Sequence, residues 1–177
     1  MDGMGLDPDL LLEWLQSRDA SIQLESLNTI CTMILFSDNV DRLFDQLSPR
    51  RFIPALARLF LIYTNENDVL SKDPQKFFVL ETAARALTNY LDVSVNCSKR
   101  LVAVTGSLTA MSKIIESADL SVMCQKDIAE QLVKAFEFVS SREPDELYQS
   151  GALRAVLKLI KNGRGEGANN RQLRKIC

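Results

Sequence analysis

Three nine-residue segments of this 177-residue chain align with one another, and this internal repetition constrains the fold more than any other feature. In each copy an alanine stands at the fourth position, a basic residue stands at the seventh, and apolar side chains fill most of the others. A glycine directly precedes the second and the third copy. Such self-similarity predicts stacked units that bury their apolar faces against one another. The copies are residues 52–60, 107–115 and 152–160.

Helix start signals divide the chain at regular places. A side-chain acceptor followed by proline, which suits an N-cap and the first helical position, occurs at 7–8, 48–49 and 73–74. Proline within an acidic segment at 143–146 indicates a fourth start. Apolar residues then recur at intervals of three and four, as in the stripes within 80–91 and 128–139. No alternating run bounded by hairpin signals occurs, so the predicted class is all-α.

A second repeated element accompanies the first. Glu25, Glu81 and Glu130 each head an amphipathic stretch, and short helical segments precede the alanine-containing copies. Each unit therefore reads as a short helix, a middle helix and a longer helix. The interval of 45 between Ala110 and Ala155 fits armadillo or HEAT repeats. We therefore predict an armadillo/HEAT-like right-handed helical solenoid of about three to four repeats.

The same alignment predicts the domain organisation. The interval from Ala55 to Ala110 is ten residues longer than the next one, which places a polar loop insertion at 63–73. We assign 1–161 to the repeat domain and 162–177, where the pattern stops, to a flexible tail containing glycine and arginine. The apolar side of the last helix would face solvent if nothing followed it. We therefore expect the natural protein to continue past this point or to self-associate there.

Several blocks of the sequence resemble a known family. Residues 52–56 followed by 80–91 look like the armadillo consensus for its second and third helices. Residues 7–16, 37–42, 88–94, 127–134 and 142–144 resemble the extreme N-terminal, armadillo-like part of a large HECT-type E3 ubiquitin ligase with ankyrin repeats. The resemblance covers roughly 6–161. It implies a parent protein that transfers ubiquitin to substrate lysines with a cysteine of its HECT domain, which this chain lacks.

The composition argues against chemistry within the chain itself. There is no histidine, which removes the usual general base and the commonest metal ligand. The cysteines form no Cys-x-x-Cys pair, and we expect reduced thiols in a protein of the cytoplasm or nucleus. We predict no catalytic residue, cofactor or metal. A net charge of −2 and the lack of about 20 consecutive apolar residues argue against nucleic acid and membrane as partners. The cysteines are Cys31, Cys97, Cys124 and Cys177.

The remaining role is protein binding on the concave face formed by the longer helices. In armadillo proteins that hold extended basic peptides, this face carries recurring tryptophan and asparagine. Asn89 matches the asparagine column, whereas Arg85 and Lys134 occupy the tryptophan column, so a nuclear-import type of groove is not predicted. We predict that Arg85, Asn89 and Lys134 contact partner proteins and that the two basic residues favour acidic segments. The alternative is that they are ordinary solvated helix positions.

Two functions fit these observations. The first is a substrate- or adaptor-binding module of a HECT-type ubiquitin ligase, with the rest of the parent chain as a further partner. The second is a stand-alone armadillo scaffold with no link to ubiquitin.

Overall fold

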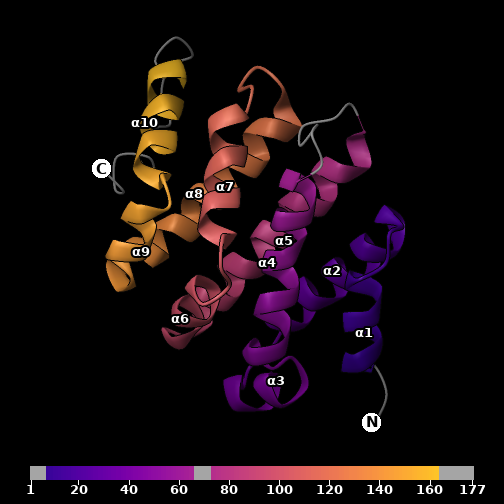
Figure 1. Ribbon diagram of the computed structural model, residues 1–177. Coiled ribbons are helices and arrows are strands. Elements are labelled where there is room, and N and C mark those ends of the chain that lie inside the picture. The colour runs from indigo at the N-terminus through magenta and orange to yellow at the C-terminus, as the bar shows by residue number, and fades with distance from the viewer. Residues whose placement is uncertain (1–6, 66–72, 164–177) are drawn as a thin grey trace.

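The computed structural model describes residues 7–65 and 73–163, and within these ranges every regular element is an α-helix. The helices follow the chain from α1 at one end of the molecule to α9 and α10 at the other (Figure 1). They are α1 (Pro8–Leu15), α2 (Ala20–Leu35), α3 (Val40–Gln46), α4 (Pro49–Asn65), α5 (Pro74–Val93), α6 (Asn96–Val102), α7 (Ser107–Ser117), α8 (Met123–Arg142), α9 (Pro144–Gln149) and α10 (Ala152–Gly163). The prediction of an all-α fold is confirmed.

The predicted helix starts are also confirmed. Helices α1, α4, α5 and α9 each begin at the proline that the sequence marks. The carboxylates of Asp7 and Asp73 accept hydrogen bonds from backbone N–H groups of the first turn, as N-cap side chains do. Asp19 and Asn39 cap α2 and α3 in the same way. Residues of the local sequence therefore cap the starts of α1, α2, α3 and α5.

The two glycines ahead of the repeated segments have a conformational reason. Gly106 and Gly151 adopt φ of +81° and +84°, in the left-handed region that other residues avoid. Each lies in the turn that leads into α7 or α10. At Gly106 an added Cβ would also lie 3.3 Å from the Cδ2 atom of Leu61. The repeated glycine therefore permits a tight turn between the short helix and the middle helix of a unit.

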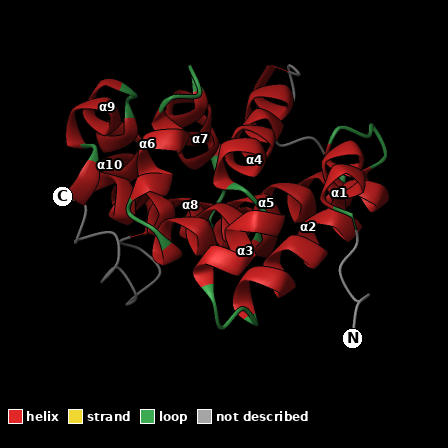
Figure 2. Ribbon diagram, turned by 90° about the horizontal axis from the view of Figure 1, so that it is seen from below, coloured by secondary structure: helices red, strands yellow, loops and turns green. Residues whose placement is uncertain are grey.

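The helices form two layers, which follow from the repeat. The three alanine-containing segments lie in α4, α7 and α10, and α7 packs against both of the others. The stretches headed by the repeated glutamates lie in α2, α5 and α8, and α5 packs between the other two. Figure 2 shows α4, α7 and α10 above α2, α5 and α8. Stacking of successive helices within each layer is the arrangement of a helical solenoid.

The core lies between these layers and runs continuously through the molecule. Apolar stripes at three- and four-residue spacing supply it from both sides, so neighbouring units share one core. The armadillo or HEAT type of the repeats and the hand of the solenoid stay predictions. Fully buried large side chains include Leu27, Ile30, Phe52, Leu56, Phe60, Leu80, Tyr90 and Phe136.

The predicted domain boundaries fall partly outside the described residues. Helix α4 continues through Asn65, so the first three residues of the predicted insertion at 63–73 are helical, while 66–72 are not described. Helix α10 continues to Gly163, so the first two residues of the predicted tail at 162–177 are helical. The other residues of that tail lie outside the described residues. Leu153 and Leu157 of α10 are exposed, and so is Tyr148 of the neighbouring helix α9.

Candidate protein-binding face

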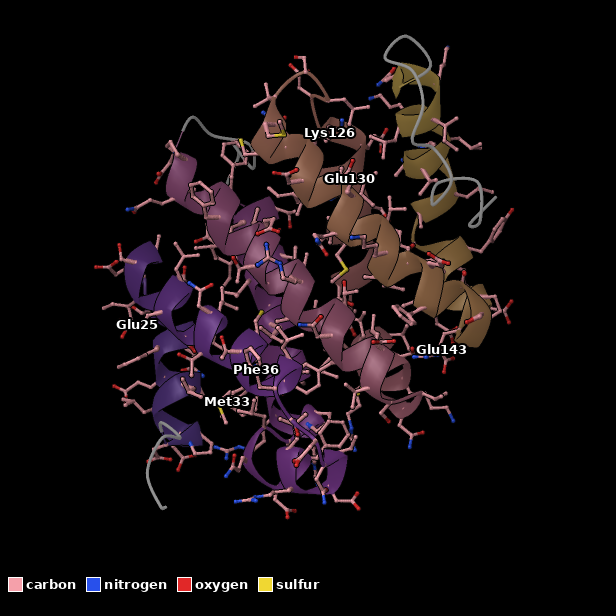
Figure 3. All side chains as sticks on the ribbon, turned by 180° about the vertical axis from the view of Figure 1, so that it is seen from behind. Glu25, Met33, Phe36, Lys126, Glu130 and Glu143 are labelled. Carbon is pink, nitrogen blue, oxygen red and sulfur yellow. The ribbon has the colours of Figure 1, made fainter. Side chains whose placement is uncertain are left out.

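The outward side of α2, α5 and α8 is the candidate binding surface, and we call it the long-helix face. Three successive positions, four residues apart, lie on one side of each helix because four residues complete about one turn. Figure 3 shows the three helices side by side, with Glu25 and Met33 on α2 and Glu130 on α8. All nine side chains are exposed or half-buried. They are Glu25, Thr29 and Met33 of α2, Glu81, Arg85 and Asn89 of α5, and Glu130, Lys134 and Phe138 of α8.

The three residues predicted to contact partners all belong to this face. Arg85 is exposed, and Asn89 lies one turn further along α5 and is half-buried. Lys134 is half-buried on the neighbouring helix α8. The fold thus brings the three residues onto adjacent helices of one layer, which sequence alignment alone could only suggest. Their contact with a partner stays a prediction.

The charge on Arg85 is already compensated within the chain. Its guanidinium forms an ion pair with the carboxylate of Glu81, four residues earlier on α5. Spacing of this kind places an acidic and a basic side chain next to each other on a helix. Because the pair is partly exposed, its contribution to stability is small. Its main consequence is electrostatic, since Arg85 presents less positive charge to a partner than its sequence position implies.

A hollow opens on the long-helix face between the first halves of α5 and α8 and the adjoining part of α2. Its volume is about 420 Å³. Arg85 lines it, whereas Asn89 and Lys134 do not. We call it the long-helix hollow. Its walls combine apolar and charged side chains, namely Leu24, Asn28, Phe77, Phe78, Glu81, Thr82, Arg85, Cys124 and Asp127.

Phe78 is the residue of this hollow that sequence reasoning missed. Phe77 packs into the core, but the side chain of Phe78 is 55% exposed. It falls outside the apolar stripe of α5 and shares a side of the helix with Glu81 and Arg85. A large aromatic residue on the polar side of an amphipathic helix was the available signal, because such a position offers the ring no core contact.

The described cysteines differ in environment. Burial raises the pKa of the Cys31 thiol to about 11, and the nearby Arg85 opposes part of that rise. Burial likewise raises the pKa of Cys97 to about 11. Cys124 is half-buried and lines the long-helix hollow. Since the thiolate is the reactive form, Cys31 and Cys97 are expected to react slowly with alkylating agents near neutral pH.

Among the residues that the structure describes, no group of three or more His, Cys, Asp or Glu side chains is positioned to hold a metal ion. None of their helices combines the length and the apolar character that a membrane span requires.

Comparison with known proteins identifies relatives of this chain. No family model matches it. Over 160 residues, or 89% of the chain, it is 40% identical to the E3 ubiquitin-protein ligase hecd-1 of Caenorhabditis elegans. Identity and coverage are the same for the E3 ubiquitin-protein ligase Ufd4 of Drosophila melanogaster. The chain spans only 6% of the length of each of these relatives.

A solved structure shares the fold. The crystal structure of an engineered protein superposes on 97% of this chain with a TM-score of 0.64 and 18% sequence identity. The chain covers 60% of that protein. At this level of identity the likeness concerns the arrangement of helices alone.

Proposed function

We propose that this chain is a protein-binding module that recruits substrates or adaptors. Its resemblance to a region of HECT-type E3 ubiquitin ligases is confirmed by 40% identity over 89% of its length. In this proposal the parent protein transfers ubiquitin to lysines of the recruited substrate. The module acts in the cytoplasm or nucleus, and its partners include the remainder of the parent chain.

The observation that carries the proposal is the match to ligases across nearly the whole chain, combined with an exposed face built from repeated helices. A helical solenoid offers a broad surface whose positions recur from unit to unit, which suits recognition of other proteins. The alternative of a stand-alone armadillo scaffold is less well supported, because hecd-1 and Ufd4 are both E3 ubiquitin-protein ligases of much greater length.

We further propose that Arg85, Asn89 and Lys134 contact the partner. The three side chains come from two packed helices and lie on the same layer of the molecule. Arginine is enriched at the energetic centres of protein interfaces. Partner binding at Arg85 would either preserve its ion pair with Glu81 or exchange it for one with the partner.

Capture of partners from cell lysate by the purified chain tests this assignment. We expect the double reversal Arg85→Glu and Lys134→Glu to lower the recovery of specific partners about tenfold, a loss of about 1.4 kcal/mol in binding. The matched control reverses Arg58 and Lys158, which are exposed on α4 and α10 of the other layer and change the net charge equally. Quantitative mass spectrometry compares the recovered proteins. Equal recovery with both double variants would contradict the assignment.

A further inference from the structure

We propose that the long-helix hollow binds a peptide segment of the partner in which one large apolar side chain stands next to a basic side chain. The inference rests on the proposed function and deepens it, because it names the chemistry that the module recognises. Three properties of the hollow support it: its apolar wall, its residual charge and its open shape across three helices.

The apolar wall is suited to receive an anchoring side chain. Leu24 of α2, Phe77 and Phe78 of α5 and Cys124 of α8 all line the hollow. More than half of the Phe78 side chain is in contact with solvent, so covering it removes apolar surface from water. Met123, the residue before Cys124, is also strongly exposed. Aromatic side chains beside a hollow are typical of positions that dominate binding energy.

The charges around this wall favour a basic neighbour for the anchor. Three charged side chains line the hollow, and two of them, Glu81 and Arg85, neutralise each other in an ion pair. The carboxylate of Asp127 is left. Glu130, one turn further along α8, is also exposed, but it stands four residues from the exposed Lys126 and does not line the hollow. A lysine or arginine beside the anchor would approach the Asp127 carboxylate, whereas an acidic residue at that position would be repelled. An acidic part of the partner is expected instead at Lys134, which lies outside the hollow.

The position of the hollow favours a peptide segment of a partner protein as its occupant. Its volume of about 420 Å³, at the low end of the roughly 300–1,000 Å³ of small-molecule sites, is sufficient for one large side chain. The hollow lies on an exposed face, between three helices, and one of its lining residues is Arg85, which we assign to partner binding. A partner chain lying across the face can therefore place one side chain in the hollow while contacting Asn89 and Lys134 beyond it.

A display library of random 12-residue peptides, selected on the 177-residue chain, tests the proposal. We expect the enriched peptides to share a large apolar residue adjacent to lysine or arginine. A selected peptide, synthesised with a fluorescent label, is then titrated with variants and followed by anisotropy. Phe78→Ser should weaken its binding at least tenfold, and Asp127→Lys should weaken it several-fold. Phe36→Ser is the matched control, because Phe36 is 79% exposed at the end of α2 and does not line the hollow.

Alkylation of the thiols provides a second readout that does not need a substitution. The peptide should slow the reaction of Cys124 with iodoacetamide, followed by mass spectrometry of its own proteolytic peptide. Cys97 serves as an internal reference, since it does not line the hollow and its raised pKa keeps it slow with or without peptide. If protection of Cys124 instead rises with the concentration of the chain alone, the occupant is a second copy and the proposal is overturned.

The outcomes separate this inference from the proposed function. Enrichment of acidic peptides, no enrichment, or equal binding by the Phe78 and Phe36 variants would overturn the inference. If lysate partners survive Phe78→Ser but are lost on reversal of Arg85 and Lys134, the module binds through its face without using the hollow. If both sets of variants retain every partner, the proposed function of this face fails as well. If Phe78→Ser fails to fold, the binding of the selected peptide by Asp127→Lys tests the inference instead.

Discussion

Replacement of Tyr90 by alanine is expected to lower the free energy of unfolding by about 3–5 kcal/mol, the usual cost of deleting a large aromatic side chain from a core. Tyr90 lies on α5 with no exposed surface. Its hydroxyl donates a hydrogen bond of 2.8 Å to the carbonyl oxygen of Leu47, directly after α3. Its ring stacks against Phe44 with the ring centroids 6.2 Å apart. Loss of this side chain therefore leaves a cavity and removes both contacts of Tyr90 with the α3 region.

Chemical denaturation followed by circular dichroism measures this effect, and Tyr90→Phe separates its parts. The phenylalanine variant keeps the ring but leaves the Leu47 carbonyl without its donor, so we expect a loss of about 1–3 kcal/mol. Burial raises the pKa of Tyr90 above its ordinary value. The contribution of protonated Tyr90 to the free energy of unfolding is therefore fully present below about pH 10. It is lost as the pH rises further, because the tyrosine ionises more readily in the unfolded chain than in the folded one. The stability of Tyr90→Phe should therefore lack this loss at alkaline pH. If both variants unfold like the wild type, the contacts of Tyr90 with the α3 region do not stabilise the fold.

Replacement of Arg142 by alanine is expected to cost about 1.5–3 kcal/mol, the range for hydrogen bonds made by charged groups. Arg142 is half-buried at the end of α8. Its guanidinium donates to the carbonyl oxygens of Leu91, at 2.7 Å, and Ser94, at 3.5 Å, and to the hydroxyl of Ser98, at 3.2 Å. The positively charged guanidinium thus lies next to the last carbonyl groups of α5, at the negative end of the helix dipole. One side chain thereby joins the end of α5, the start of α6 and α8.

Arg154→Ala is the matched control for this prediction. Arg154 forms an ion pair with Glu116 at 3.6 Å, but its side chain is 79% exposed. Exposed ion pairs contribute about 0–1 kcal/mol, so the control should unfold close to the wild type in the same titration. Arg142→Lys should recover only part of the loss, because the ammonium does not reproduce the planar guanidinium, which also lies 5.2 Å from the centroid of the Phe138 ring. Equal stabilities for the two alanine variants would show that the Arg142 contacts are energetically unimportant.

Sequence alone predicted the helical framework because its signals are local. Proline at Pro8, Pro49, Pro74 and Pro144 acts on its own backbone, and the repeated glycines act on their own φ angles. Repetition of the alanine-containing segments correctly placed them in equivalent helices of one layer, because equivalent positions in stacked units meet equivalent surroundings. The start of α2 at Ala20 was not predicted, although Asp19 gives it an ordinary N-cap.

The binding face was predicted less completely, since its properties depend on packing between units. The i to i+4 spacing of Glu81 and Arg85 already allowed their ion pair, which changes the charge that the face presents. The hollow requires Leu24, Phe78 and Asp127 to approach from three helices, and no local pattern fixes that approach. The capping of α5 by Arg142 likewise joins residues about 50 positions apart, so only the stacked fold creates it.

Site-specific photo-crosslinking tests most directly the claim that the long-helix face binds partner proteins. A benzophenone amino acid replaces Asn89 on α5 in one variant and Ile62 on α4 in another, since the side chain of Ile62 is 53% exposed on the other layer. Irradiation in cells, followed by purification under denaturing conditions, traps only proteins in direct contact. The account predicts adducts from position 89 and none from position 62. Adducts of equal yield from both positions, or from position 62 alone, would contradict it.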